Sequence, residues 1–280
     1  MKSPRPYVAV TGITSTAEIA HLDLLRDRLP SLSRRVVAGI LVSAKTLRGE
    51  PTRNRRYPDI DVVWSLCVDA LVKRWIPAIH YNTCAKGDDL ARELDALHEA
   101  APHMRMLQLN VVSPDPRVVK AWRAKHPDVE IVLQLNDGTR REALARATRL
   151  DASCNLFFAT KFWHEAVDHV LIDGSRGEGR AFDVRTVGSE IACSAPDFYH
   201  HAKVRVGVAG GLGPDSHETL DALRSSLGDH LFAPLSFDAE TGLRSPVDDP
   251  IPGEKGQDAL DLRKVEAFLR LFSETPAEAT

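Results

Sequence analysis

The sequence of 280 residues predicts an α/β protein that folds as one closed (β/α)8 barrel. Three observations support this fold class. Eight short apolar runs alternate with helical patterns, no linker rich in Gly, Ser or Pro divides the chain, and barrels of this class commonly have about 250 residues. Alternating strands and helices form a parallel sheet, and eight units favour a closed barrel over an open doubly wound sheet, which is the alternative.

Each apolar run has the length of a buried strand, and several end in a polar or turn-forming residue. We expect strands over Tyr7–Thr11, Val36–Val42, Ile76–Tyr81, Met104–Leu109, Ile131–Leu135, His169–Asp173, Val204–Ala209 and Leu231–Phe237.

Recurring apolar residues predict helices between these strands, and in the first helix they are three or four positions apart. The first helix ends before Pro30, and a later one begins with Asp115 as N-cap and Pro116 in the first turn. The apolar positions are Ile19, Leu22, Leu25 and Leu29; Val63, Leu66, Ala70 and Leu71; Leu90, Leu94 and Leu97; Ala143, Ala145 and Leu150; and Leu260, Leu262, Val265, Phe268 and Leu269.

We expect a single domain over residues 1–280 with two additions to the barrel. One is an extended loop, 48–60, in which Arg53, Arg55 and Arg56 are expected to coat a solvated surface. The other is an insertion, 151–166, expected to add a short helix around Phe157, Phe158 and Trp163.

Composition excludes several classes of partner. The net charge of -3 provides no basic field for nucleic acid, and no apolar segment approaches the 20 or so residues that a membrane span needs. Four cysteines without a C-x-x-C pair indicate a reduced, cytoplasmic setting without structural zinc, and the N-terminus lacks a signal-peptide core. No three-ligand metal pattern is readable, so we expect neither metal nor cofactor.

Asp173 is the first candidate for proton chemistry, because it stands where a buried strand gives way to a loop containing Gly174, Gly177 and Gly179. In a β/α repeat the loop after a strand lies on the catalytic face, and glycines let backbone N–H groups approach a ligand. The alternative is that Asp173-Gly174 only forms a turn.

Side-chain alternation predicts a polar barrel interior. Along three neighbouring strands the inward positions are His80 and Asn82, then Gln108 and Asn110, then Gln134 and Asn136. We expect the deeper glutamines to bond to one another and the outer asparagines to face a ligand. His80 is either a proton-transfer base or a satisfied core histidine.

Several motifs occur in the order of a known family. Val10-Thr-Gly-Ile13 is similar to a Cys-Gly-Ile element, the segment 39–48 to an apolar run followed by Lys-Ser-x-Arg, and Leu107-Gln-Leu-Asn110 to Gln-Leu-His. Later come the glycine-spaced loop ending in Phe182-Asp183, then Ala209-Gly-Gly-Leu-Gly-Pro214, Asp238-Ala-Glu-Thr-Gly242 and Pro252-Gly-Glu-Lys. Together they resemble the phosphoribosylanthranilate isomerase family, TIM barrels of the phosphate-binding type that catalyse an Amadori rearrangement in tryptophan biosynthesis.

The resemblance implies catalytic roles. Asp173 would be the general acid, and Arg48 would hold an anionic substrate group. Thr11 stands where the family has its general base, a cysteine. A threonine hydroxyl is a very poor base near pH 7, whereas a thiol has a pKa of about 8.5. His80 is therefore the candidate replacement.

The resemblance also implies a binding surface. Gly210, Gly211, Thr241 and Gly242 would bind phosphate, and Gly177 and Gly179 would contact the substrate together with Asn82, Asn110 and Asn136. Glu240 replaces a serine of the family pattern. Its carboxylate must turn away from a phosphate or pair with a cation, for instance Arg244.

The sequence thus predicts an isomerase-like enzyme that acts on a small anionic substrate, a phosphorylated sugar derivative, by acid/base chemistry. Two alternatives stay open. One is a different lyase or hydrolase that uses Asp173 and His80, and the other is a binding homologue that has the pocket without the reaction. The oligomeric state stays open.

Overall fold

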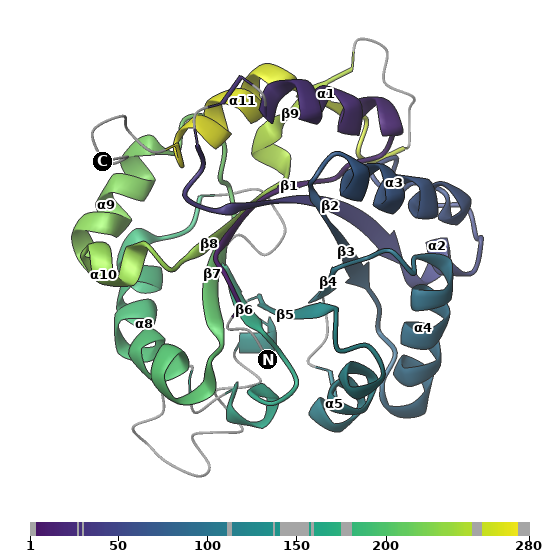
Figure 1. Cartoon of the computed structure of the whole chain (residues 1–280), viewed down its shortest axis with the longest axis horizontal. Coiled ribbons are helices and arrows are strands. Elements are labelled where there is room, and N and C mark those ends of the chain that lie inside the picture. Colours follow the sequence, from purple (N-terminus) through teal and green to yellow (C-terminus); the bar gives the residue numbers. More distant parts are fainter. Residues whose placement is uncertain are drawn as a thin grey trace.

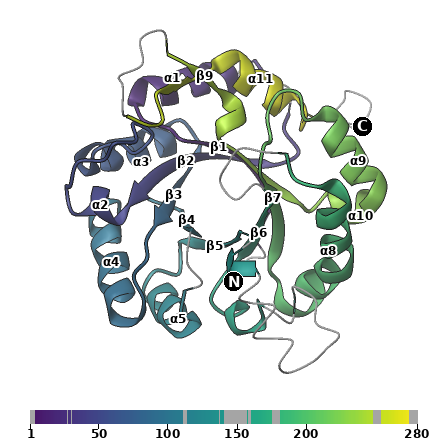
Figure 2. The ribbon, with the colours of Figure 1, turned by 180° about the vertical axis from the view of Figure 1, so that it is seen from behind.

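The computed structural model describes residues 4–26, 28–29, 31–110, 114–136, 138–140, 157, 160–174, 181–247 and 254–273. Eight parallel strands close into a barrel in sequence order, β1 to β8, and the prediction of a (β/α)8 barrel is confirmed. The helices form a ring around the strands in both axial views (Figure 1, Figure 2).

Most strands lie within two residues of the predicted bounds. They are β1 (Tyr7–Thr11), β2 (Arg35–Ser43), β3 (Ile76–Asn82), β4 (Met106–Asn110), β5 (Glu130–Leu135), β6 (His169–Asp173), β7 (Arg205–Ala209) and β8 (Ser236–Ala239).

The predicted start of the eighth strand is wrong. Leu231 and Phe232 belong to a short helix, α10 (Asp229–Phe232), and β8 begins only at Ser236. Leu231 and Phe232 are buried, and the Arg34 guanidinium lies over the Phe232 ring, 5.7 Å from its centroid. A short apolar run fits a buried helix as well as a strand, so its length and composition did not separate the two.

The helices follow the predicted alternation. Asp115 accepts a hydrogen bond from the Arg117 N–H, and Pro116 occupies the first turn, as predicted. The helical pattern at 143–150 and Phe158 lie outside the described residues; Trp163 ends a short 3-10 turn. The elements are α1 (Thr16–Arg26), α2 (Ala44–Leu47), α3 (Ile60–Val72), α4 (Gly87–Ala100), α5 (Pro116–Lys125), η1 (Lys161–Trp163), α8 (Val184–Asp197), η2 (Phe198–Ala202), α9 (His217–Leu227), η3 (Thr241–Leu243) and α11 (Leu262–Arg270).

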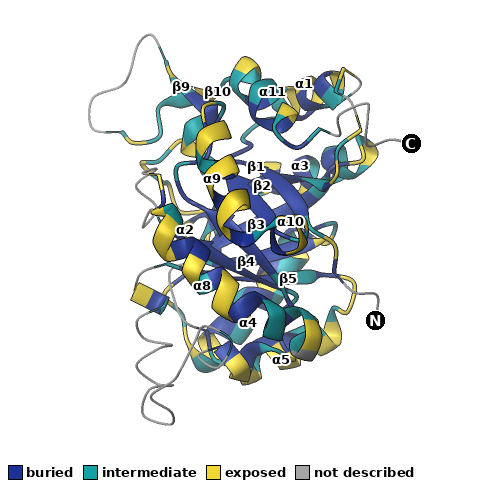
Figure 3. Cartoon of the chain, turned by 90° about the vertical axis from the view of Figure 1, so that its left-hand side faces the viewer, coloured by how far each residue is buried: buried dark blue, intermediate teal, exposed yellow. Residues whose placement is uncertain are grey.

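The strands separate two apolar clusters. Alternate residues such as Ile79, Leu107 and Leu133 pack outward under the helices. Smaller inward residues, including Ala9, Ala78 and Ala209, fill the lumen. Figure 3 shows buried strands at the centre and exposed faces on the surrounding helices. Polar residues that continue this inward-facing row at the strand ends therefore point into the mouth of the barrel.

A short hairpin follows β8 and fixes the loop after β2. Strands β9 (Arg244–Pro246) and β10 (Asp258–Leu260) pair antiparallel. Just before β10, Lys255 bridges to Asn54; its N–H donates to Arg53 O at 2.7 Å, and its carbonyl accepts from the Arg55 N–H at 3.0 Å. The loop is thus held at the mouth by backbone hydrogen bonds.

Candidate active site at the mouth of the barrel

A polar cavity of about 320 Å³ lies at the carboxyl ends of the strands, where barrels of this class place their active sites. Its lining combines residues of β2 to β8 with residues of the loops after β2, β5, β7 and β8. These residues are Leu41, Asn54, Arg56, Tyr57, His80, Asn82, Gln108, Asn110, Gln134, Asn136, Asp173, Ala209, Gly210, Gly211, Leu212, Asp238, Glu240 and Thr241.

Asp238 is the central titratable group of the cavity. Burial, together with the nearby charge of Asp173, raises the pKa of Asp238 to about 7. Hydrogen bonds from the Thr11 hydroxyl, at 2.6 Å, and from Gln108 act in the opposite direction, because they favour the charged carboxylate. A carboxyl that titrates near neutral pH can both give and take a proton there.

Strand register brings Asp238 and Asp173 to the same space. Ala209 on β7 pairs with Asp173 on one side and with Asp238 on the other. Two strand spacings put the backbones of the two aspartates roughly 10 Å apart, and their side chains point inward. Because Ala209 is small, the space between the two carboxyl groups stays open.

Two amides link the aspartates. Gln134 Nε2 donates to Asp173 Oδ2 at 2.7 Å, and Gln108 Nε2 donates to Gln134 Oε1 at 3.3 Å. Gln108 also hydrogen-bonds Asp238. The predicted glutamine network is present, and it fixes the orientation of both carboxyl groups.

Thr11 and His80 converge on Asp238 because Gly39 lies between them. A Cβ atom at Gly39 would collide with Thr11 Oγ1 and lie 2.9 Å from His80 Nε2. Nδ1 of His80 lies 3.8 Å from Asp238 Oδ2. Burial lowers the pKa of His80 to about 4, so the imidazole is neutral near pH 7 and is a weaker base than Asp238.

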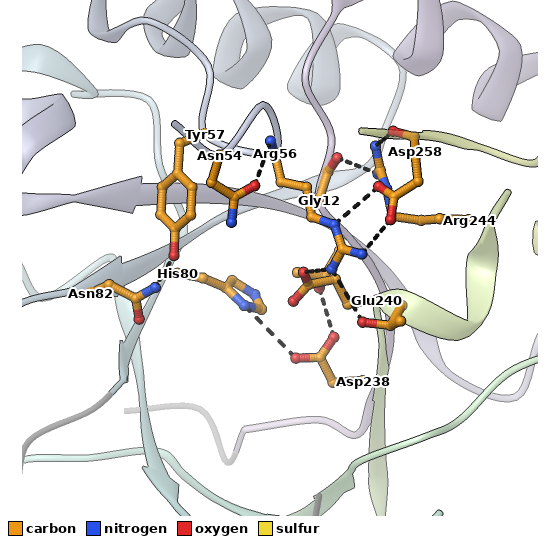
Figure 4. Close-up of polar contacts among 12 residues, drawn as sticks. Gly12, Asn54, Arg56, Tyr57, His80, Asn82, Asp238, Glu240, Arg244 and Asp258 are labelled. Carbon is orange, nitrogen blue, oxygen red and sulfur yellow. Dashed lines mark hydrogen bonds and ion pairs between the residues drawn. The ribbon is translucent and has the colours of Figure 1, made fainter. Parts of the chain in front are cut away.

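The three outer asparagines line the cavity in different ways. Asn82 donates its amide N–H to the hydroxyl of Tyr57, from the loop after β2 (Figure 4). Asn136 Oδ1 accepts from the backbone N–H groups of Gly138 and Thr139. Asn110 Oδ1 is buried and has no hydrogen-bond partner among the described residues. Their predicted ligand roles are untested.

An ionic network closes one side of the mouth (Figure 4). Arg56 donates to Glu240 at 2.8 Å and also pairs with Asp258. Arg244 pairs with Asp258 at 2.6 Å and donates to Gly12 O at 2.7 Å. Glu240 is therefore paired with Arg56 and not with Arg244. The expectation that Arg56 coats a solvated loop is wrong, since its side chain is only 16% exposed and bonds to two carboxylates.

The glycine-rich loops lie beside this network. Gly210 and Gly211 have positive φ of 110° and 64°, which glycine adopts without strain. A Cβ atom at Gly242 would collide with the Leu212 carbonyl, so the loops after β7 and β8 touch there. Gly210, Gly211 and Thr241 line the cavity with Glu240 among them, and phosphate binding stays a prediction.

Arg48 does not join this site. It lines a neighbouring depression with Lys45, is 53% exposed in its side chain, and donates to Glu50 at 2.6 Å. Gly177 and Gly179 lie outside the described residues.

Sequence reasoning missed Asp238, together with Asn54, Arg56 and Tyr57. The alternation that identified His80 and Gln108 also places Ser236 and Asp238 on one face of β8, but the predicted strand ended at Phe237, one residue before Asp238. The loop residues carried no comparable signal, because their position depends on contacts with a hairpin about 200 residues later.

The described ranges contain neither a metal-binding cluster nor a membrane-spanning helix. No group of three or more His, Cys, Asp or Glu side chains there has an arrangement that could hold a metal ion. None of the helices there combines the length and the apolar character needed to cross a membrane.

The fold resembles that of several solved barrels. TrpF from Jonesia denitrificans is 20% identical, with 95% of this chain and 96% of that one covered and a TM-score of 0.50. A phosphoribosylanthranilate isomerase in complex with reduced 1-(o-carboxyphenylamino)-1-deoxyribulose 5-phosphate is 13% identical, with 95% and 97% covered and a TM-score of 0.51. A GH113 β-1,4-mannanase is 10% identical, with 97% and 99% covered and a TM-score of 0.53.

The expected resemblance to the isomerases is thus confirmed for the fold. The mannanase, an enzyme of another class, has a TM-score similar to that of the isomerase. The likeness in fold alone therefore does not identify a reaction. No protein-family model matches the sequence, and no curated protein sequence matches it.

Proposed function

We propose that this protein is a barrel enzyme that moves protons on a small, polar, sugar-derived substrate by isomerase-type chemistry. The observation that carries the proposal is the pair Asp173 and Asp238 in an amide-lined cavity, with the pKa of Asp238 raised to about 7. Perturbed carboxyl groups in a cleft are the usual means by which enzymes run acid and base steps at neutral pH.

The pair suits a two-step proton transfer. Asp173, as carboxylate, takes the proton from a carbon next to a carbonyl or imine, while protonated Asp238 gives its proton to the carbonyl oxygen or imine nitrogen. In the second step Asp238 takes a proton back from the neighbouring hydroxyl, and Asp173 returns its proton to the adjacent carbon. The double bond moves, and no proton is consumed overall.

In this proposal the other residues bind and orient. Gln108 and Gln134 hold the carboxyl groups, and Thr11 stabilises the ionised form of Asp238. Asn82, Asn110 and Asn136 face substrate hydroxyls. His80, neutral beside Asp238, is a positioning residue rather than the base.

The test is deuterium incorporation from D2O into a panel of sugars, followed by proton NMR. The panel includes aldoses, amino sugars, their phosphate esters and phosphoribosylanthranilate. We expect exchange with at least one member, lowered by a hundredfold or more in Asp173→Asn and in Asp238→Asn. Asp88→Asn makes the same change on the exposed face of α4 and should leave the rate unchanged.

Two outcomes would contradict the proposal. Exchange at the wild-type rate in both active-site variants would show that the two carboxyl groups take no part in the proton transfer. Thermal stabilisation by a panel member without exchange or turnover of any member would favour the binding homologue.

A further inference from the structure

Glu240 lies at the position where barrels of this class commonly bind phosphate, between the loops after the seventh and eighth strands. It lines the cavity beside Gly210, Gly211 and Thr241. Its carboxylate accepts from Arg56 Nη1 at 2.8 Å, and the same nitrogen donates to the Thr241 hydroxyl at 3.1 Å. Arg56, the cation that would face an incoming anion here, already holds a carboxylate of the chain itself.

Arg56 is fixed in this arrangement. Its Nε donates to Asp258 Oδ1 at 3.0 Å and its Nη2 to Asp258 Oδ2, so one guanidinium serves two carboxylates. The backbone on either side is tied to Lys255, and Arg55 pairs with Glu254 at 2.5 Å. Turning Arg56 toward a phosphate would leave Glu240 and Asp258 without this partner.

The charge of the cavity also disfavours a phosphate. Of the described residues that line the cavity, three carry a carboxyl group: Asp173, Asp238 and Glu240. One, Arg56, carries a guanidinium group. A phosphate monoester would bring up to two further negative charges into this partly buried space, where like charges repel more strongly than in water.

The hydrogen-bonding groups favour a ligand that donates. Asn110 Oδ1 is buried and has no partner among the described residues, and a buried acceptor without a donor is costly. Substrate hydroxyl or amine groups supply N–H and O–H donors, whereas an ionised phosphate supplies acceptors only. The carboxylates of Asp173 and Glu240, which accept from Gln134 and Arg56, add acceptors and no donors to this lining.

We propose that the cavity binds a polyhydroxylated substrate that carries no phosphate, with Glu240, held by Arg56, occupying the anion position. This inference rests on the proposed function and names its substrate class. It departs from the sequence prediction that Gly210, Gly211, Thr241 and Gly242 bind phosphate.

The test compares matched ligand pairs by isothermal titration calorimetry: D-ribose with D-ribose 5-phosphate, and D-glucosamine with D-glucosamine 6-phosphate. The wild-type protein should bind the ligand without phosphate at least tenfold more tightly in each pair that binds. Glu240→Gln removes the charge and keeps the size, and should shift the preference toward the phosphate ester by at least tenfold. Glu254→Gln makes the same change at the partner of Arg55, outside the cavity lining, and should leave the preference unchanged.

Three results would overturn the substrate class. They are tighter binding of the phosphate ester by the wild type, no change of preference in Glu240→Gln, and failure of both phosphate-free ligands to bind. Turnover of a phosphorylated sugar that depends on Asp173 and Asp238 would reject this inference while supporting the proposed enzyme. Binding of phosphate-free ligands without proton exchange on any panel member would support this inference and reject the proposed enzyme.

Discussion

Thr11 Oγ1 donates a hydrogen bond of 2.6 Å to Asp238 Oδ1 across the seam where β1 and β8 close the barrel. The hydroxyl is too weak an acid and base to move protons itself near pH 7. It acts on Asp238 instead, because a hydrogen bond to the ionised carboxylate lowers the pKa that burial has raised.

Replacing Thr11 by valine should therefore raise the pKa of Asp238. A hydrogen bond to a charged group contributes about 1.5–3 kcal/mol, and one pKa unit corresponds to about 1.4 kcal/mol, so we expect a rise of about one to two units. Carbon-13 NMR titration of the Asp238 carboxyl measures the shift. Thr11→Ser keeps the donor and should stay near the wild-type value; equal pKa values in both variants would disprove the role of the hydrogen bond.

Asp238→Asn should stabilise the protein most at high pH. The pKa of Asp238 is about 7 in the folded chain against an ordinary 3.8, so the folded state binds the proton more tightly. Stability from this group is therefore complete at low pH and is lost as pH rises from about 4 to 7. The gain in unfolding free energy of the variant should be about 2–3 kcal/mol larger at pH 8 than at pH 5, by urea denaturation. A gain that does not change with pH would contradict the raised pKa.

His80→Gln should show the opposite pH dependence. The pKa of His80 is lowered from 6.5 to about 4, so the unfolded chain binds the proton more tightly, and stability falls as pH drops from about 6.5 to 4. The variant should gain about 2 kcal/mol at pH 5 relative to pH 8. Between pH 4 and 6.5 the contributions of Asp238 and His80 to the stability of the wild type change with pH in opposite directions. Each single variant therefore shows the contribution of the group that remains. A flat difference between His80→Gln and the wild type would refute the neutral buried histidine.

The sequence predicted the barrel because its strands are local apolar runs. Tyr7–Thr11 and His169–Asp173 have the predicted bounds, since each run ends at a polar residue and a turn. The prediction of a strand from Leu231 is wrong because Leu231 and Phe232 are buried as part of a short helix, with Arg34 over the Phe232 ring, and periodicity over so few residues does not separate a helix from a strand.

The site was predictable where it depends on strand alternation. His80 and the asparagines follow from a period of two along single strands, and Asp173 follows from the end of its strand before a glycine-spaced loop. The pKa of Asp238 depends on Asp173 and Thr11, which come from two other strands, and the pairing of Arg56 depends on Glu240 and Asp258. Such long-range contacts are set by barrel closure and have no local sequence pattern.

Gly39→Ala should disturb the site through Thr11. The new Cβ atom would collide with Thr11 Oγ1, so we expect a loss of about 1–3 kcal/mol in unfolding free energy and an upward shift in the pKa of Asp238 as the hydrogen bond is displaced. Thr11→Ala removes the colliding oxygen. In that background Gly39→Ala should cost less, and the double-mutant cycle should give a coupling energy of at least about 0.5 kcal/mol. The measurement is urea denaturation of the four proteins at pH 7; strictly additive losses would show that Gly39 serves only backbone packing and not the approach of Thr11 to Asp238.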